Sequence, residues 1–186
     1  ETVDTAADHY ARGDWQAAYD AWSRTGPDGL SAAELDCYGA VVELVGTHDE
    51  VVPVLQRAFR AHHQVGDLHA AAGCASRLSM SLAEHGEHAL AAGWAARATE
   101  LVDEIGEECA ERGWLAFLMM FRALGEGDLA ETERLAQEAY DVGRRFHDAD
   151  LTAMSTCARG RMSIMTGHFA EGLAQLDDSM VRVVAG

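Results

Sequence analysis

The hydrophobic pattern is clearest between Trp114 and Tyr140, where it predicts two helices joined by one turn. Residues 114–121 are eight consecutive apolar residues, a run too short to cross a bilayer and too continuous for a surface stripe. We therefore expect a helix that is buried on most of its sides. Gly125-Glu126-Gly127 ends it, and from Leu129 apolar residues recur at the three- and four-residue spacing of an amphipathic helix.

The same turn recurs along the chain, which makes the hairpin a repeat. The turn glycines are Gly13, Gly46, Gly86, Gly127 and Gly167, at separations of 33, 40, 41 and 40 residues. Such periods are typical of stacked helix pairs, because one pair alone cannot bury both of its faces and neighbouring pairs must cover each other. We predict an all-α fold, a right-handed α-solenoid of about five antiparallel helix pairs.

The predicted pairs fill the chain as one domain, residues 1–186. They lie at approximately residues 2–24, 31–65, 68–104, 107–147 and 150–184. Ser31 and Glu34 have the spacing of a capping box at the start of the second pair. In the third pair, the small residues of 70–75 and 91–98 are expected to let the two backbones approach closely. The chain begins without methionine and ends just after a helical pattern, so we expect it to be part of a longer protein.

Composition and charge narrow the possible partners. The 186 residues are 48% hydrophobic with only 2 prolines, and no strand-length run alternates with period two, which favours an all-α fold. The 31 acidic residues against 14 basic ones give a net charge of −17, which repels phosphate backbones and anionic membranes. We expect no contact with nucleic acid or membrane, and we expect partners that are neutral or basic. Because the sequence has no secretory signal, we also expect a cytoplasmic protein whose four cysteines are reduced.

The residues around each turn glycine carry a family resemblance. The positions seven before the glycine, five after it and twelve after it hold mostly small residues. These three sets are Ala6, Gly39, Ser79, Met120 and Gly160; Ala18, Val51, Ala91, Thr132 and Gly172; and Thr25, Ala58, Ala98, Ala139 and Ser179. With Met120 as the main departure, the pattern resembles the tetratricopeptide repeat (TPR), which implies stacked helix pairs that bind other proteins.

A second resemblance concerns biological context. The period of about 40 residues and the closing stretch 176–186 are similar to helical arrays inside large actinobacterial LuxR-type and maltose-regulator-like transcription activators. That resemblance implies a sensor or interaction segment of a transcription regulator. The DNA-binding domain of such proteins is a separate C-terminal domain, to which nothing in this chain corresponds. A free-standing scaffold that mediates protein–protein interaction is the alternative.

The TPR resemblance also implies a binding groove, since the first helix of each pair lines the concave surface in that family. Carried onto the fourth and fifth pairs, the groove positions are Trp114, Phe117, Phe121, Leu124, Met154, Cys157, Arg161 and Ile164. Such a groove suits an amphipathic helix of a protein partner or a small hydrophobic effector. Alternatively, these side chains pack against adjacent repeats or a further domain. Arg161 is expected to pair with a bound carboxylate or with Asp148, Asp150 or Glu126.

Other chemistry finds little support. His62, His63 and His69, or His85 and His88, would be the metal ligands to consider, but adjacent residues point about 100° apart on a helix. We therefore predict no metal and no cofactor. The sequence contains no GxSxG, phosphate-binding loop or HExxH motif, so we predict no enzymatic activity. The acidic residues of 103–111 fit a solvated loop or a dock for a basic partner, and uncapped terminal repeats allow a homodimer.

Overall fold

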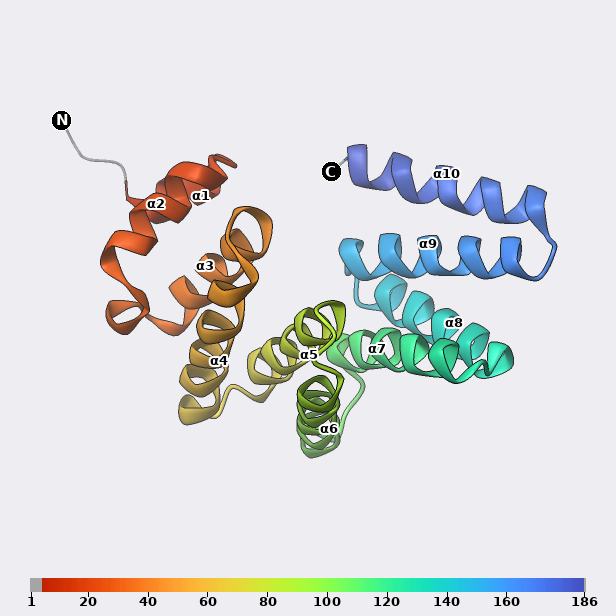
Figure 1. The fold of residues 1–186 in the computed structure, drawn as a ribbon, viewed down its shortest axis with the longest axis horizontal. Coiled ribbons are helices and arrows are strands. Elements are labelled where there is room, and N and C mark those ends of the chain that lie inside the picture. The colour runs from red at the N-terminus through yellow and green to blue at the C-terminus, as the bar shows by residue number, and fades with distance from the viewer. Residues whose placement is uncertain (1–4, 186) are drawn as a thin grey trace. The chain divides into compact units, whose positions relative to one another are not determined.

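The computed structural model describes the backbone of residues 5–185 and the side chains of residues 5–181. This part of the chain contains ten α-helices, one 3-10 helix and no β-strand (Figure 1). The elements are α1 (Ala6–Ala11), α2 (Trp15–Thr25), η1 (Pro27–Gly29), α3 (Ala32–Val45), α4 (His48–Val65), α5 (Leu68–Glu84), α6 (His88–Ile105), α7 (Ala110–Glu126), α8 (Leu129–Arg145), α9 (Ala149–Met165) and α10 (Phe169–Ala185). The predicted start of the first pair at residue 2 lies outside the described residues.

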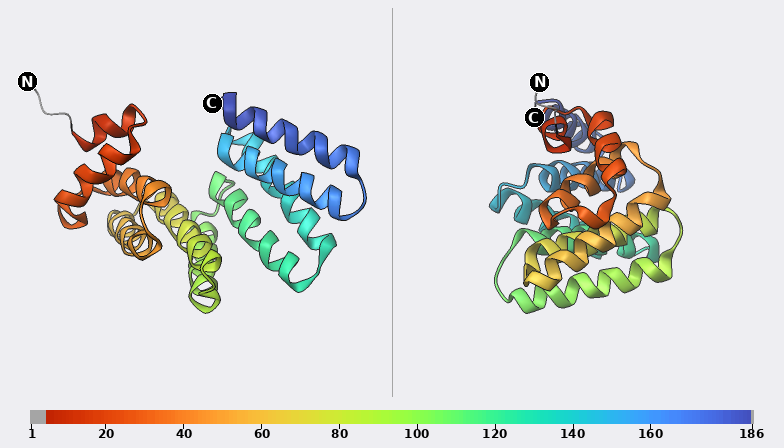
Figure 2. Two further views of the ribbon diagram at one scale, coloured as in Figure 1. Left: turned by 45° about the horizontal axis from the view of Figure 1, so that its top comes forward. Right: turned by 90° about the vertical axis from the view of Figure 1, so that its left-hand side faces the viewer.

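Contacts between α-carbons divide the chain into two compact units, Glu1–Ile105 with α1–α6 and Gly106–Gly186 with α7–α10. In the first unit each helix packs on the helix that follows it, and α5 lies between α4 and α6. In the second unit α8 packs on α7 and α9, and α10 packs on α9 (Figure 2). Each unit is a stack of antiparallel helix pairs, and the single domain over residues 1–186 stays a prediction.

The turns and caps follow from local chemistry. Gly127 and Gly167 have φ of 79° and 88°, the left-handed region that glycine adopts without a steric penalty. The Asp128 side chain then accepts a 3.0 Å hydrogen bond from the Glu131 N–H and caps α8. At α3 the expected capping box forms, because Ser31 N donates to Glu34 Oε2 at 2.9 Å and Glu34 N donates to Ser31 Oγ at 3.3 Å.

The core of the first unit is a continuous apolar cluster that runs through successive pairs. Its largest members include Trp22, Tyr38, Leu55 and Leu78, which are exposed by 5% or less. Because these side chains come from α2, α3, α4 and α5, no single pair holds them alone. Burial between neighbouring pairs is what holds a solenoid together, and the first unit shows that arrangement directly.

Small residues let the two helices of a pair meet. A Cβ atom added to Gly172 would lie 2.6 Å from the carbonyl oxygen of Gly160, twelve residues earlier. In the third pair, Ser79 Oγ donates a 2.9 Å hydrogen bond to the carbonyl of Ala91, again twelve residues later. These are the positions seven before and five after the turn glycine, so the repeated pattern marks the crossing point of each of these pairs.

The expectation that small residues let α5 and α6 approach holds at Ala91, but it is wrong for two glycines. Gly73 and Gly93, in the stretches expected to allow close approach, have no heavy atom within 4 Å of an added Cβ. Ala71, Ala72 and Ala75 in the same stretch are fully buried. The two glycines therefore lie on open faces of α5 and α6, and the alanines form the buried face of α5.

We predict that Gly172→Ala destabilises the chain by about 1–3 kcal/mol, because the added methyl group would overlap a backbone carbonyl and Ile164 Cγ1, each 2.6 Å away. Chemical denaturation followed by circular dichroism measures the change. Gly125→Ala is the matched control in the same unit, since nothing lies within 4 Å of its Cβ. It should stabilise the helix by about 0.5–1 kcal/mol, and equal effects of the two variants would contradict the close approach at Gly172.

Candidate partner-binding surface

Helix α7 presents a row of aromatic side chains at helical spacing. The rings of Trp114 and Phe117 lie 6.1 Å apart, and those of Phe117 and Phe121 lie 5.2 Å apart, both edge to face. Phe117 is only 3% exposed, whereas Phe121 is 48% exposed. The expectation that residues 114–121 are buried on most sides is therefore wrong for Phe121. Helix α7 packs mainly on α8 within its unit, and Phe121 lies on a face that this contact does not cover.

A partly buried hydrogen bond joins α7 to the start of α9. Trp114 Nε1 donates to Asp148 Oδ2 at 2.7 Å, and the other oxygen of Asp148 caps α9 by accepting from Leu151 N at 2.9 Å. The two helices run in the same direction (Figure 1). The start of α7 is thereby fixed against the start of α9, so residues at equal distances from this bond lie at similar heights along the two helices.

On helix α9, Met154, Cys157 and Arg161 share one face because they are spaced by three and four residues. Met154 is 38% exposed, Cys157 is half-buried and Arg161 is exposed. We call the set Trp114, Phe117, Phe121, Met154, Cys157 and Arg161 the α7–α9 face; Phe117 is buried beneath it, and the other five are half-buried or exposed. The structure brings all six predicted residues onto two neighbouring helices of one unit.

The intramolecular ion pair expected for Arg161 is not found among the described residues. Glu126, one expected partner, accepts a 2.9 Å hydrogen bond from Arg122 on its own helix. Asp148, another, is engaged by Trp114 and by the start of α9. Arg161 therefore places an exposed guanidinium beside apolar side chains, as a group that can receive a carboxylate from outside the described part of the chain.

The first unit contains a shallow apolar pocket that was not predicted from the sequence. It has a volume of about 390 Å³ and is lined by Phe59, Ala89, Leu90, Gly93, Trp94 and Arg97. The rings of Phe59 and Trp94 meet edge to face at 5.0 Å, and Leu90 is 56% exposed. The only signal in the sequence is Gly93 beside Trp94, since a residue without a side chain leaves room next to a large ring.

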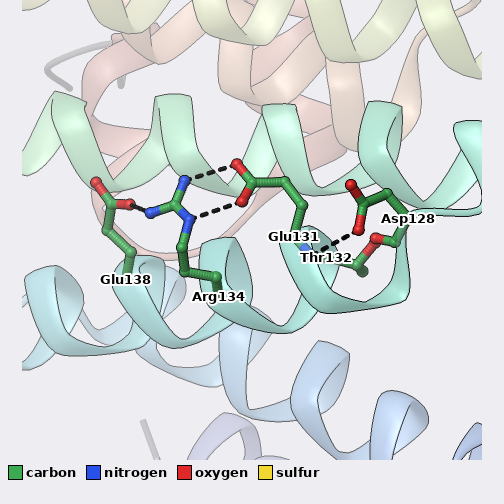
Figure 3. Close-up of polar contacts among 5 residues, drawn as sticks. All are labelled: Asp128, Glu131, Thr132, Arg134 and Glu138. Carbon is green, nitrogen blue, oxygen red and sulfur yellow. Dashed lines mark hydrogen bonds and ion pairs between the residues drawn. The ribbon is translucent and has the colours of Figure 1, made fainter.

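A cleft in the second unit has both polar and apolar side chains in its lining. It measures about 530 Å³ and lies among α8, α9 and α10, with Arg134 and Arg159 in its lining. Arg134 is held along its own helix by Glu131 at 2.7 Å and Glu138 at 2.8 Å (Figure 3). Hydrogen bonds from Arg134 lower the pKa of the Glu131 carboxyl. With its charge compensated in this way, Arg134 offers no free cation for an anionic ligand.

The histidines considered as metal ligands have different partners, and one of the cysteines is deeply buried. His63 stacks on Phe59 and its Nε2 lies 2.7 Å from Arg97, whereas the adjacent His62 is buried. His85 Nδ1 lies 2.8 Å from the carbonyl of Ser81. Burial raises the pKa of the Cys74 thiol to about 12, so this thiol is a poor nucleophile at neutral pH.

No helix among the described residues combines the length and apolar character needed to cross a membrane. Neither a scan against protein-family models nor a search of curated proteins finds a match to this chain.

Similarity to solved structures is clear at the level of the fold. The chain is similar to BtubC (BKLC) from P. vanneervenii, with a TM-score of 0.62 and 16% identity over 97% of this chain and 77% of that one. Two structures of a putative kinesin light chain from Podosopora anserina, described as having nearly identical TPR-like repeats, give TM-scores of 0.55 and 0.54 at 12% identity. They cover 95% and 97% of this chain, and 90% and 92% of theirs. Together with the helix pairs, these similarities confirm the predicted all-α solenoid of TPR-like repeats.

Proposed function

We propose that this chain is a non-catalytic protein-interaction module whose α7–α9 face binds a short amphipathic segment of a partner protein. The observation that carries the proposal is the exposure of large apolar side chains, 48% for Phe121 and 38% for Met154, together with an exposed Arg161 on α9 that has no ion pair among the described residues. Covering such side chains removes apolar surface from water, at about 25 cal/mol per Å².

The geometry of the face supports an elongated ligand. Phe121 is seven residues along α7 from Trp114, and Met154 is six residues along α9 from Asp148. Because Trp114 and Asp148 are hydrogen bonded, Phe121 and Met154 lie at nearly the same height, about 10 Å from that bond. Arg161 lies about two turns further along α9. A helical peptide that presents two apolar side chains and then a carboxylate matches this order.

The chemistry of the remaining residues supports binding without catalysis. Burial raises the pKa values of the Cys37, Cys74 and Cys109 thiols, which disfavours the thiolate that a nucleophile requires. Arg134, which lines the cleft among α8, α9 and α10, forms ion pairs with Glu131 and Glu138. The net charge of −17 favours partners that are neutral or basic overall, with their acidic group confined to the position that meets Arg161.

The finer context is also a proposal. The similarity of the 40-residue period and of residues 176–186 to LuxR-type and maltose-regulator-like activators supports a sensor or interaction segment of a bacterial transcription regulator. The side chains of residues 182–186 lie outside the described part of the chain. A free-standing cytoplasmic scaffold is equally compatible with the TPR-like fold. A small hydrophobic effector or a second copy of the chain would use the same exposed residues, and the binding experiment below separates these occupants.

We predict that peptides selected by display against the purified chain are amphipathic and lose affinity when the α7–α9 face is altered. Phe121→Ala and Met154→Ala should each weaken binding by about 1–2 kcal/mol, or roughly 5- to 30-fold. Fluorescence anisotropy with a labelled peptide measures this. Leu173→Ala is the control, because Leu173 is 57% exposed on α10 of the same unit. Unchanged affinity in the first two variants, or equal loss in the control, would disprove the site.

Charge reversal tests the cation separately. Arg161→Glu should abolish the preference for a peptide carboxylate, whereas Arg122→Glu, at an exposed arginine already paired with Glu126, should leave it intact. Thermal shift with small hydrophobic compounds and the concentration dependence of the oligomeric state identify the other two occupants. If a compound stabilises the chain, the occupant of the face is a small effector and not a peptide. If the chain forms a dimer that Phe121→Ala abolishes, the occupant is a second copy of the chain.

We also predict that Phe117 and Phe121 differ sharply in their contribution to stability. Phe117→Ala should destabilise the chain by about 3–5 kcal/mol, because it empties a buried site. Phe121→Ala should cost only about 1 kcal/mol, since half of that side chain is already in water. Urea denaturation measures both. A large loss for Phe121→Ala would mean that this ring has a structural role, and the face would then lose its main anchor.

A further inference from the structure

Three helices of the first unit bring a carboxylate, an imidazole and a thiol together. Asp36 lies in α3, His62 in the last turn of α4 and Cys74 in the middle of α5. His62 Nε2 is 2.8 Å from Asp36 Oδ2, and Cys74 Sγ is 3.7 Å from Asp36 Oδ1. One ligand atom of each residue lies within 4.8 Å of those of the other two. His62 and Cys74 are 6% and 2% exposed, so two of the three residues are buried, whereas Asp36 is partly exposed.

The three donors are those of zinc-class cations. Zinc binds sulfur at about 2.3 Å, and nitrogen and oxygen at about 2.0–2.2 Å, with tetrahedral geometry, which places ligand atoms about 3.3–3.7 Å apart. The 3.7 Å distance from Cys74 Sγ to Asp36 Oδ1 lies at the upper end of this range. The 2.8 Å distance from His62 Nε2 runs to the other oxygen, Asp36 Oδ2, and would have to open by about 0.5 Å when a cation binds.

A second carboxylate lies where the supporting shell of a metal-binding histidine is expected. Asp67 Oδ2 is 3.5 Å from His62 Nδ1, the nitrogen that faces away from Asp36. Asp67 is itself fixed, because its Oδ1 accepts a 3.1 Å hydrogen bond from Ala70 N at the start of α5. A carboxylate on the second ring nitrogen orients a histidine for metal binding and makes it a stronger ligand. This observation is independent of the three donors.

The charges around the cluster leave a place for a cation. Two aspartates flank the single imidazole. The neighbouring cation is Arg77, whose guanidinium is bonded to Glu43 by Nη2 at 2.6 Å and by Nε at 3.2 Å. Arg77 is therefore largely committed to another carboxylate. The Asp36 side chain, 38% exposed, offers a path to solvent and room for a fourth ligand from water.

We propose that Asp36, His62 and Cys74 form a three-ligand binding site for a zinc-class divalent cation, with water as the fourth ligand and Asp67 as the supporting carboxylate. The cation joins α3, α4 and α5 and so stabilises the stacking of the second pair on the third. Binding releases the proton of the Cys74 thiol, because only the thiolate ligates metal. The site belongs to the first unit and is independent of the α7–α9 face.

Cobalt titration tests the proposal directly. The full chain, treated with chelator and kept reduced, should on addition of Co²⁺ develop a thiolate-to-cobalt charge-transfer band and the intense visible bands of tetrahedral coordination. Zn²⁺ should abolish these bands by competition and raise the melting temperature. Mg²⁺, which prefers six oxygen ligands, should do neither.

Variants assign the signal to these residues. Cys74→Ala should lose the charge-transfer band, whereas Cys157→Ala, at a half-buried thiol of the other unit, should keep it. Because a buried substitution can disturb folding, Asp36→Asn provides a second test at a partly exposed side chain. It should weaken Co²⁺ affinity by at least about tenfold with an unchanged circular dichroism spectrum, and Asp67→Asn should weaken it by about 10- to 100-fold.

Absence of the bands in the unmodified chain would overturn the proposal. Bands that persist in Cys74→Ala would overturn it too, since the cobalt would then be bound by another thiol. In either case the cluster would be a hydrogen-bonded aspartate–histidine pair that joins α3 to α4 without a cation.

Discussion

The close approach of two helix backbones, seen in the pairs α5/α6 and α9/α10, is the contact from which the rest of this structure is best understood. At Gly160 and Gly172 the approach leaves no space for a methyl group, and at Ser79 and Ala91 it is close enough for a side chain to reach the opposite backbone. A pair held this tightly cannot place large side chains at its own crossing point. In these two pairs the large side chains point toward the next pair or toward solvent.

Contacts between successive pairs are carried by burial and by a few polar bonds that recur at a regular distance in sequence. Glu43 to Arg77, His63 to Arg97 and Trp114 to Asp148 are all separated by 34 residues. Each joins equivalent helices of neighbouring pairs, which fixes how far one pair is shifted along the next. Exposed ion pairs within a single helix, such as those of Arg134 with Glu131 and Glu138, contribute little to stability and mainly keep the surface polar.

The fold was largely predictable because its determinants are local. Turn glycines, capping residues and the small positions twelve apart all act within one pair of helices, so they leave a pattern that a reader of the sequence can follow. The predictions that were wrong concerned the environment of individual residues. Phe121 was expected to be buried, and Gly73 was expected at a close contact, because apolar periodicity shows which residues share a face but not whether another helix covers that face.

The same limit explains why the Asp36, His62 and Cys74 cluster has no motif. Asp36 is 26 residues from His62 and 38 from Cys74, and the three come from three different helices. Metal motifs are recognisable when one turn or one helix holds several ligands; here the shift between successive pairs brings the ligands together. Since that shift is set by the contacts between pairs, a cation at this site would reinforce an arrangement that packing already favours. It would add stability to α3–α5 without changing their order, which is why its effect should be seen in unfolding and metal spectra and not in the fold itself.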